Sequence, residues 1–198
     1  MHVRRTILGK NFFARSTCAV ARDLIGMFLV QKRGAKEYSY MITEVEAYDG
    51  FYDKASHAHK GKTERNAIMF GHAGNFYIYL VYGMYYMLNI VTGEKNYPAA
   101  ILIRGACFWP DNLKNGKQHH VAASAIRGPG VLTKHMKISK TLNEKKACKK
   151  TGVWFEDRGV KMSSRSIKRA KRIGVGYAGP IWANKKYRFI YEGNCINY

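Results

Sequence analysis

The chain has 198 residues, of which 46 % are hydrophobic and 24 % charged, a composition that suits one globular domain and excludes a disordered basic tail. Its 34 Lys and Arg residues against 13 Asp and Glu residues leave a formal net charge of +21. Such a surface attracts polyanions, so nucleic acid is the first expected partner, ahead of anionic membranes and acidic proteins. The alternative is that the charge only keeps the protein soluble.

The amino-terminal region predicts one short helix and no targeting segment. Ser16 or Thr17 can cap a helix over residues 18–25, and Gly26 is placed to end it. No apolar segment follows the first charges, and no window of about 18 apolar residues occurs anywhere in the chain. We therefore expect a soluble, intracellular protein with no secretion signal and no membrane partner.

An antiparallel hairpin is expected next, because two apolar segments, 27–32 and 38–47, flank a short turn at Gly34. A βαβ crossover would need a longer connection. The polar segment 49–74 contains several glycines and predicts loops with at most one helical turn. Loops of this kind commonly carry functional sites.

Residues 76–90 form the most aromatic stretch of the chain and are too many for one strand of usual length. Gly83 tolerates a positive φ angle and offers a point where the chain folds back. We therefore predict two short strands with Tyr82 at the hairpin tip. The later elements are a buried strand at 99–106, a surface loop at 110–118, a turn at 127–130, an exposed connection at 141–152, a short basic helix at 166–173 and a strand at 187–191.

Together these elements predict an α+β fold. A single domain over residues 1–198 should contain a mostly antiparallel, curved sheet with surrounding short helices and a protruding hairpin. The chain shows no internal repeat and no low-complexity segment.

Four of the 13 acidic residues lie within ten positions of this basic chain, namely Glu44, Glu46, Asp49 and Asp53. The period of two along a strand puts Glu44 and Glu46 on one face, with Glu46 at the strand's end beside the glycine-containing loop. Neighbouring cations keep a carboxylate ionised, and an ionised Glu can act as a general base toward water. The alternative is that these acids form ordinary surface ion pairs.

Several tyrosines have the chemistry to receive a nucleic acid base. A large aromatic such as Tyr82 has nothing to pack against at a hairpin tip, and proteins that extrude a base from a duplex need such a wedge. Tyr48, Tyr77 and Tyr79 could wall a pocket in which a base stacks. Asn89 closes an apolar strand, so it either meets a ligand or satisfies a nearby turn. Packing in the core is the alternative for the tyrosines.

Neither the cysteines nor the histidines predict a metal site. The four cysteines lie far apart without a CxxC pair, and we interpret Cys18, Cys107, Cys148 and Cys195 as reduced, ordinary thiols. The histidine pairs at 57 and 59 and at 119 and 120 lack a third ligand at useful spacing and match no zinc hydrolase or deaminase motif.

The segment 174–179 matches the GxGxxG pattern of dinucleotide sites. It follows a basic segment rather than a strand, and no acidic residue stands at the ribose position, so a dinucleotide site is not expected. The functional interpretation is a glycine turn that presents backbone amides to a DNA phosphate. The alternative is an ordinary turn from a helix to a strand.

A set of ordered motifs resembles the alkyladenine (3-methyladenine) DNA glycosylase family. The motifs are Ile42-Thr-Glu-Val-Glu-Ala-Tyr, Ala55-Ser-His, Thr63-Glu-Arg-Asn, Met69-Phe-Gly, Tyr77-Ile-Tyr-Leu-Val-Tyr-Gly-Met, Leu88-Asn-Ile, Leu102-Ile-Arg, Gly128-Pro-Gly-Val-Leu and Arg172-Ile-Gly-Val-Gly-Tyr-Ala-Gly. Their order and spacing, from the first strand region to the end of the chain, make the resemblance specific. It carries no function onto the Lys-rich segment 134–171 or the pair at 67 and 68.

The resemblance implies a monofunctional enzyme of base excision repair. It would flip alkylated or deaminated purines out of duplex DNA and hydrolyse the N-glycosidic bond, without a metal or an organic cofactor. Glu46 matches the glutamate that activates water, and Tyr82 the intercalating tyrosine. The implied base pocket is Tyr48, His57, Tyr77, Tyr79, Asn89 and Arg104. We also expect DNA-backbone contacts at Arg65, Gly174, Gly176 and Tyr177.

We expect this protein to act as a monomer inside the cell in the compartment that holds DNA, the cytoplasm with its nucleoid or the nucleus. Two rival interpretations each fit part of the pattern. The charge and the tyrosines alone also fit a non-enzymatic nucleic-acid-binding module. The segment 174–179 would fit the DNA clamp of a helix-hairpin-helix glycosylase, a nearly all-helical fold. The choice among 3-methyladenine, 7-methylguanine, hypoxanthine and ethenoadenine as lesions rests on the dimensions of the pocket.

Overall fold

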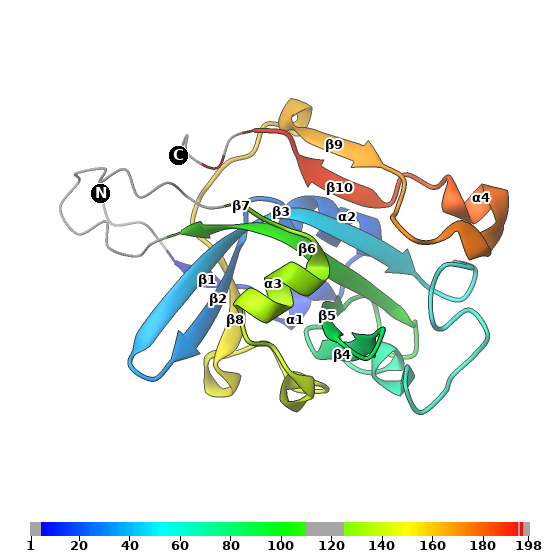
Figure 1. The fold of residues 1–198 in the computed structure, drawn as a ribbon, viewed down its shortest axis with the longest axis horizontal. Helices are drawn as coiled ribbons and strands as arrows, with labels where there is room; N and C mark the ends of the chain where they lie inside the picture. The colour runs from blue at the N-terminus through cyan, green and yellow to red at the C-terminus, as the bar shows by residue number, and fades with distance from the viewer. Residues whose placement is uncertain (1–4, 110–124, 194, 196–198) are drawn as a thin grey trace.

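Short helices surround a set of strands, two of which are much longer than the others (Figure 1). The computed structural model describes residues 5–109, 125–193 and 195. The helices are α1 (Lys10–Phe13), α2 (Thr17–Leu24), α3 (Pro129–His135) and α4 (Gly179–Ala183), with 3-10 turns η1 (Ala67–Phe70), η2 (Lys140–Leu142), η3 (Lys149–Thr151), η4 (Ser164–Ser166) and η5 (Gly176–Ala178). The strands are β1 (Thr6–Ile7), β2 (Phe28–Arg33), β3 (Lys36–Asp49), β4 (Phe76–Val81), β5 (Tyr85–Val91), β6 (Ala99–Trp109), β7 (Ala125–Arg127), β8 (Val153–Asp157), β9 (Ile167–Ala170) and β10 (Arg188–Tyr191).

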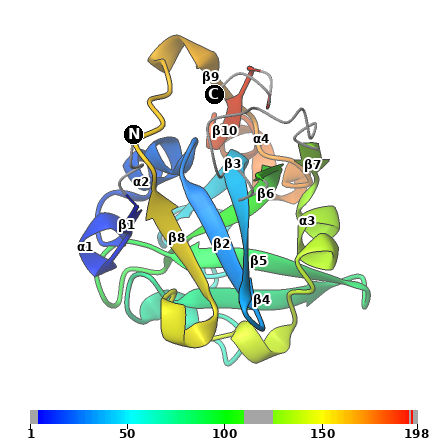
Figure 2. The ribbon, with the colours of Figure 1, turned by 90° about the vertical axis from the view of Figure 1, so that its left-hand side faces the viewer.

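The two long strands, β3 and β6, form the centre of the sheet (Figure 2). The strand order is β1-β8-β2-β3-β6-β5-β4, and every strand pair among the described residues is antiparallel. One edge of β3 pairs first with β2 and then with β10, and the outer edge of β6 pairs with β5 and then with β7. The sheet therefore forks, and one branch of the fork consists of β10, β3, β6, β5 and β4.

The core lies between this sheet and the short helices. Helix α2 packs on β3 and buries Val20, Ala21 and Leu24, while α3 packs on β5 and β6 and buries Leu132. The predicted helix at 18–25 is confirmed to within one residue at each end, and Gly26 follows it with a φ of +87°. The predicted hairpins at 27–47 and 76–90, the strands at 99–106 and 187–191 and the mostly antiparallel α+β architecture are also confirmed.

The predicted basic helix at 166–173 is wrong, because residues 167–170 form the edge strand β9. Each residue of β9 pairs with one of β10, and the guanidinium of Arg169 lies 5.4 Å from the centre of the Phe189 ring. A helix here would have left β10 as an open sheet edge. The demand for a partner strand therefore overrides the helical propensity of a Lys- and Arg-rich segment.

Two further segments differ from the prediction. The turn expected at 127–130 is confined to Gly128, whose φ is +96°, because Pro129 already begins α3, a position that suits its fixed φ angle. The connection expected to be exposed at 141–152 buries Leu142 and Ala147 and continues into the unpredicted strand β8. Its backbone exchanges hydrogen bonds with Phe76 and so covers the outer edge of β4.

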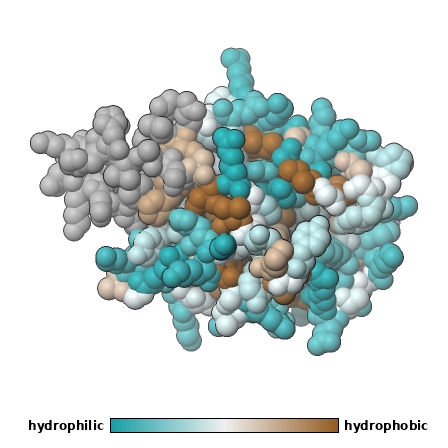
Figure 3. Space-filling view, viewed as in Figure 1, coloured by the Kyte–Doolittle hydropathy of each residue, from teal (hydrophilic) through white to brown (hydrophobic). Residues whose placement is uncertain are grey.

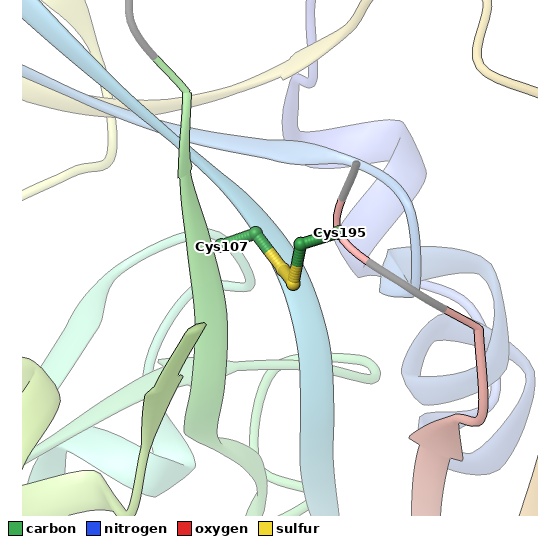
Figure 4. Close-up of a disulfide and its surroundings, with 2 residues drawn as sticks. All are labelled: Cys107 and Cys195. Carbon is green, nitrogen blue, oxygen red and sulfur yellow. A yellow bond between two sulfur atoms is a disulfide. The ribbon is translucent and has the colours of Figure 1, made fainter. Parts of the chain in front are cut away.

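The interpretation of four reduced thiols is wrong for one pair. Cys107 on β6 and Cys195 in the carboxyl-terminal segment form a disulfide, with their Cα atoms 5.9 Å apart (Figure 4). Their separation of 88 residues gives no local signal, and only the folding of the chain brings the two positions together. Cys18 and Cys148 are free thiols, as predicted.

Hydrophilic residues cover most of the face shown in Figure 3, with only small hydrophobic patches among them. This distribution agrees with the net charge of +21. In the part of the chain that the structure describes, no helix is both long and apolar enough to span a bilayer. The surface loop predicted at 110–118 lies outside the described residues.

Candidate active site

A row of paired residues crosses the β10-β3-β6-β5-β4 branch of the sheet. Arg188 pairs with Glu46, Glu46 with Leu102, Leu102 with Asn89, and Asn89 with Tyr77. Directly paired residues of antiparallel strands project to the same face of a sheet. Five strands thus bring a carboxylate, an amide and a phenol together on one surface.

A cavity of about 540 Å³ opens over this surface, within the range of small-molecule sites. All the residues predicted to form the base pocket line it, and so do Tyr82 and three of the four predicted DNA-backbone residues. These are Tyr48, His57, Tyr77, Tyr79, Asn89 and Arg104, then Tyr82, then Arg65, Gly174 and Tyr177. Gly176 is not part of the lining. Four apolar residues that were given no role also line the cavity, although each stands in one of the family motifs: Met69, Leu102, Pro129 and Ile173.

The carboxylate of Glu46 has no exposed surface and is not itself part of the cavity lining, but the three residues that donate to it all line the cavity. Three donors hold it: the Tyr48 hydroxyl at 2.9 Å from Oε2, Arg104 Nη1 at 3.3 Å from Oε2, and the Ile173 N–H at 2.7 Å from Oε1. Burial nevertheless raises the pKa of Glu46, because withdrawal of its charge from water outweighs these three donors. Arg104 does favour the ionised form, as expected, but burial has the larger and opposite effect on the pKa. A raised pKa makes the ionised form a stronger base.

Arg104 joins the two glutamates of β3. Its Nε donates to Glu44 Oε1 at 2.9 Å and its Nη1 to Glu46, while Arg188 also donates to Glu44 at 3.1 Å. The predicted common face of Glu44 and Glu46 is thus confirmed, and Glu46 itself lies within β3, three residues before the strand ends. Because the Arg104 and Glu44 side chains are only 10 % and 17 % exposed, this is not an ordinary surface ion pair.

The walls of the cavity are aromatic. His57, from the loop after β3, has Nδ1 2.9 Å from the Tyr77 hydroxyl, and its ring centre lies 4.6 Å from that of Tyr79. Burial, with the nearby Arg65 cation, lowers the pKa of His57 to about 4, so this ring is neutral at physiological pH. Burial also raises the pKa of Tyr77 to about 12. The aromatic rings in the wall are therefore uncharged.

The side-chain NH2 group of Asn89 is hydrogen-bonded to the backbone. Its Nδ2 donates to the carbonyl oxygens of Tyr77 at 3.0 Å and Met87 at 3.2 Å. Asn89 thus satisfies backbone groups of two paired strands rather than of a turn, and its contact with a ligand stays a prediction that its place in the cavity lining allows. The side chain is fixed, and its Oδ1 is the polar atom left for a bound molecule.

The β4-β5 hairpin brings Tyr82 to the mouth of the cavity, and Figure 2 shows this hairpin reaching the periphery of the molecule beyond α3. Tyr82 and Gly83 have φ angles of +53° and +67°, and the Met84 N–H donates to the Val81 carbonyl. Positive φ at both central positions characterises the tight type I′ turn. A tyrosine seldom adopts this conformation, and here its side chain is 86 % exposed.

The segment 174–179 forms a turn after β9, and it contributes to the cavity through Gly174 and Tyr177. Gly174, Gly176 and Tyr177 are exposed, and the Tyr177 hydroxyl donates to the Ala55 carbonyl at 2.9 Å. The backbone amide directly before this segment, that of Ile173, points to Glu46.

The other two acids of the predicted cluster have structural partners. Asp49 accepts the Thr17 hydroxyl at 2.7 Å, and Asp53 forms a two-pronged, fully buried ion pair with Arg172. Within residues 5–109, 125–193 and 195, no group of three or more His, Cys, Asp or Glu side chains is arranged to hold a metal ion.

The chain is similar to a known protein family over most of its length. The model of the family described as Methylpurine-DNA glycosylase (MPG) matches residues 11–195. A protein of Methanocella arvoryzae is 42 % identical, over 96 % of this chain and 96 % of its own length. Proteins of an Anaeromyxobacter species and of Legionella pneumophila are each 38 % identical, over 96 % and 94 % of this chain and 91 % and 95 % of their own lengths. All three carry the name "Putative 3-methyladenine DNA glycosylase".

Proposed function

This chain belongs to the methylpurine-DNA glycosylase family, and we propose that it is a monofunctional enzyme that rotates a damaged purine out of duplex DNA and hydrolyses its N-glycosidic bond. One observation carries the proposal. A fully buried glutamate receives hydrogen bonds from Tyr48, Arg104 and Ile173, and these three residues all line a cavity whose wall includes uncharged aromatic rings. As a DNA glycosylase the protein acts on DNA, which agrees with its net charge of +21.

Glu46 acts as the general base. The contact from Arg104 is the longest of the three donations to this carboxylate, at 3.3 Å, and Arg104 retains Glu44 as a partner at 2.9 Å. A water molecule can therefore enter between Arg104 and Glu46 at the smallest cost. Its oxygen attacks C1′ of the extruded nucleotide, its proton passes to Glu46, and the electron pair of the C1′–N bond leaves with the base. The carboxylate charge also stabilises the positive charge that develops on the sugar.

The aromatic walls receive the extruded base. Tyr48, Tyr79 and neutral His57 stack on or contact it, with Tyr77 beside them, and stacking contributes about 1–3 kcal/mol per base. Purines methylated at N3 or N7 carry a positive charge in DNA, which the electron-rich tyrosine faces favour. Deaminated purines are neutral and bind by stacking alone. Asn89, with its amide fixed by the backbone, crowds the 2-amino group of an ordinary guanine and so excludes it.

Tyr82 fills the space that the extruded nucleotide leaves in the duplex. Its exposure of 86 % and its positive φ show a side chain held outward by the turn rather than by packing. An aromatic wedge of this kind replaces lost stacking and keeps the base outside. Arg65, Gly174, Gly176 and Tyr177, all exposed, contact the phosphates on either side.

Base release from a panel of duplexes tests these assignments together. Each duplex carries one 3-methyladenine, 7-methylguanine, hypoxanthine or ethenoadenine, and free base is measured with the parent protein and with Glu46→Gln. We expect the parent to release at least one alkylated and one deaminated base, and Glu46→Gln to bind the same duplexes without releasing either.

Two controls address the alternatives. A parent protein that binds every duplex and releases no base would be a nucleic-acid-binding module instead. Covalent trapping by borohydride would show a Schiff base and contradict the monofunctional mechanism. The third alternative, a helix-hairpin-helix glycosylase, does not fit a sheet of ten strands. We further propose that one copy of the chain, as a single domain, is sufficient, which equilibrium sedimentation with and without DNA would test.

A further inference from the structure

Arg172 and Asp53 form an ion pair with no exposed side-chain surface on either partner. Arg172 Nη1 and Nη2 donate to the two carboxylate oxygens of Asp53 at 2.5 Å and 2.8 Å. Nη1 also donates to the carbonyl oxygen of Ala47 at 2.8 Å. Two-pronged contacts between a guanidinium and a carboxylate fix both side chains in one plane. Neither residue lines the cavity, and sequence analysis gave Asp53 no specific role.

This ion pair holds the donors of the catalytic carboxylate. Ile173, the residue directly after Arg172, donates its backbone N–H to Glu46 Oε1 at 2.7 Å. The Arg172 guanidinium also lies 4.9 Å from the centre of the Tyr48 ring, and the Tyr48 hydroxyl donates to Glu46 Oε2. Of the three donors to Glu46, one is thus the peptide N–H directly after Arg172, and a second, Tyr48, has its ring packed near the Arg172 guanidinium.

The partner residue, Asp53, anchors the start of the loop that carries His57. Its carboxylate accepts the N–H groups of Asp49 at 3.0 Å and of Ala55 at 3.1 Å. Ala55 lines the cavity two residues before His57 and accepts a hydrogen bond from Tyr177. One buried ion pair therefore connects three segments: the end of β3, the loop that carries His57 and the segment after β9.

We propose, on the basis of the function proposed above, that the Arg172–Asp53 pair positions Glu46 for catalysis by fixing the Ile173 N–H and the Tyr48 ring against its carboxylate. The pair touches neither the DNA base nor the reacting atoms. Its contribution is geometric, because a backbone N–H can be aimed at Glu46 only by holding the chain on either side of it.

The test compares Asp53→Asn with a matched control at another buried ion pair. The control, Glu156→Gln, disturbs an ion pair with Arg158 that is similarly buried, at 5 % and 3 % exposure and a distance of 2.9 Å, and that does not line the cavity. Single-turnover base release is measured on the duplex of the panel that the parent cleaves fastest. The rate constant and the amplitude are recorded across pH, together with the melting temperature.

Both variants should melt at a lower temperature than the parent, since each disturbs a buried pair. Only Asp53→Asn should lower the rate constant of the folded fraction, by roughly 10- to 100-fold, as expected for one hydrogen bond to a charged group. It should also move the acid limb of the rate profile to higher pH, because the Ile173 N–H lowers the pKa of Glu46 and its loss removes that effect.

The inference is overturned if Asp53→Asn reduces only the amplitude and melting temperature and keeps the parental rate constant and acid limb, as Glu156→Gln should. Arg172→Lys provides a second measurement if Asp53→Asn does not fold, because lysine retains the charge and loses the two-pronged contact. If Arg172→Lys kept the parental rate constant and acid limb, the inference would likewise be overturned. If instead the proposed function were wrong, the parent protein itself would release no base.

Discussion

Replacement of Glu46 by glutamine should remove catalysis without destabilising the protein. The side chain has no exposed surface, and its pKa is raised because burial outweighs the three donors. Its ionised form is therefore less stable in the folded protein than in the unfolded chain. Glutamine has nearly the same shape and no charge, so it removes this cost at neutral pH.

The magnitude follows from the balance of gains and losses at the site. Each unit by which folding raises the pKa corresponds to about 1.4 kcal/mol of relief. Against this, the new amide leaves one former donor without an acceptor, at a cost of about 1–3 kcal/mol. Arg104 is not that donor, because it retains Glu44. Because the two effects oppose each other, we expect any destabilisation to stay below the cost of that one donor, about 1–3 kcal/mol, or a few degrees in melting temperature.

The sign of the pH dependence can be stated separately. A carboxyl whose pKa is raised by folding adds stability that is fully present below its unfolded-state pKa and is lost as the pH rises through its folded-state pKa. Relative to the parent, Glu46→Gln should therefore be most favoured above the folded-state pKa. This relative advantage should shrink as the solution is made acidic.

In contrast to stability, the rate of base release should fall strongly in Glu46→Gln. Loss of a general base lowers rates by about 10²–10⁴-fold, and loss of a charge beside the developing oxocarbenium lowers them further. Single-turnover base release measures the rate, and thermal melts at several pH values measure stability. Glu44→Gln is the matched control, since Glu44 lies on the same face and binds the same arginine, whereas the Tyr48 hydroxyl and the Ile173 N–H donate to Glu46. Its rate should fall far less.

One result would refute this reasoning. If Glu46→Gln melted more than about 10 °C below the parent, a loss of several kcal/mol, while its folded fraction still released base at the parental rate, the carboxylate would be a structural group.

Three further predictions follow from the same structure. The single-turnover rate should rise with pH through an apparent pKa above the ordinary glutamate value, and His57 should not contribute in that range because its pKa is about 4; a limb that survives in a neutral variant of Glu46 would contradict this. Tyr82→Ala should reduce excision from a fully paired duplex by roughly 5- to 150-fold, the equivalent of one stacking contact of about 1–3 kcal/mol, and should matter less in a mismatched duplex. Met84→Ala, on the same turn and 69 % exposed, should have little effect, and equal losses in both variants would argue against a wedge. Cys195→Ser should cost about 2–4 kcal/mol, because the disulfide to Cys107 closes a loop of 88 residues, and a reductant should lower the parental melting temperature equally; unchanged melting in both would exclude the disulfide in solution.

Local features of the chain were predictable where neighbouring residues decide them. Gly83 in the aromatic stretch indicated a hairpin with Tyr82 at its tip, because a tight turn requires a positive φ angle. The alternation of β3 put Glu44 and Glu46 on one face for the same local reason. The ordered motifs indicated the family, and through this resemblance they predicted the pocket residues that line the cavity.

Only the tertiary structure decided which distant groups meet. The basic segment at 167–170 became a strand because β10 needed a partner, and Asp53 found Arg172 across 119 residues of chain. The direction of the Glu46 pKa shift was likewise out of reach, because composition reveals the nearby cations but not the complete loss of water around the carboxylate. Propensities act between neighbours along the chain, whereas burial and pairing depend on elements that the fold brings together.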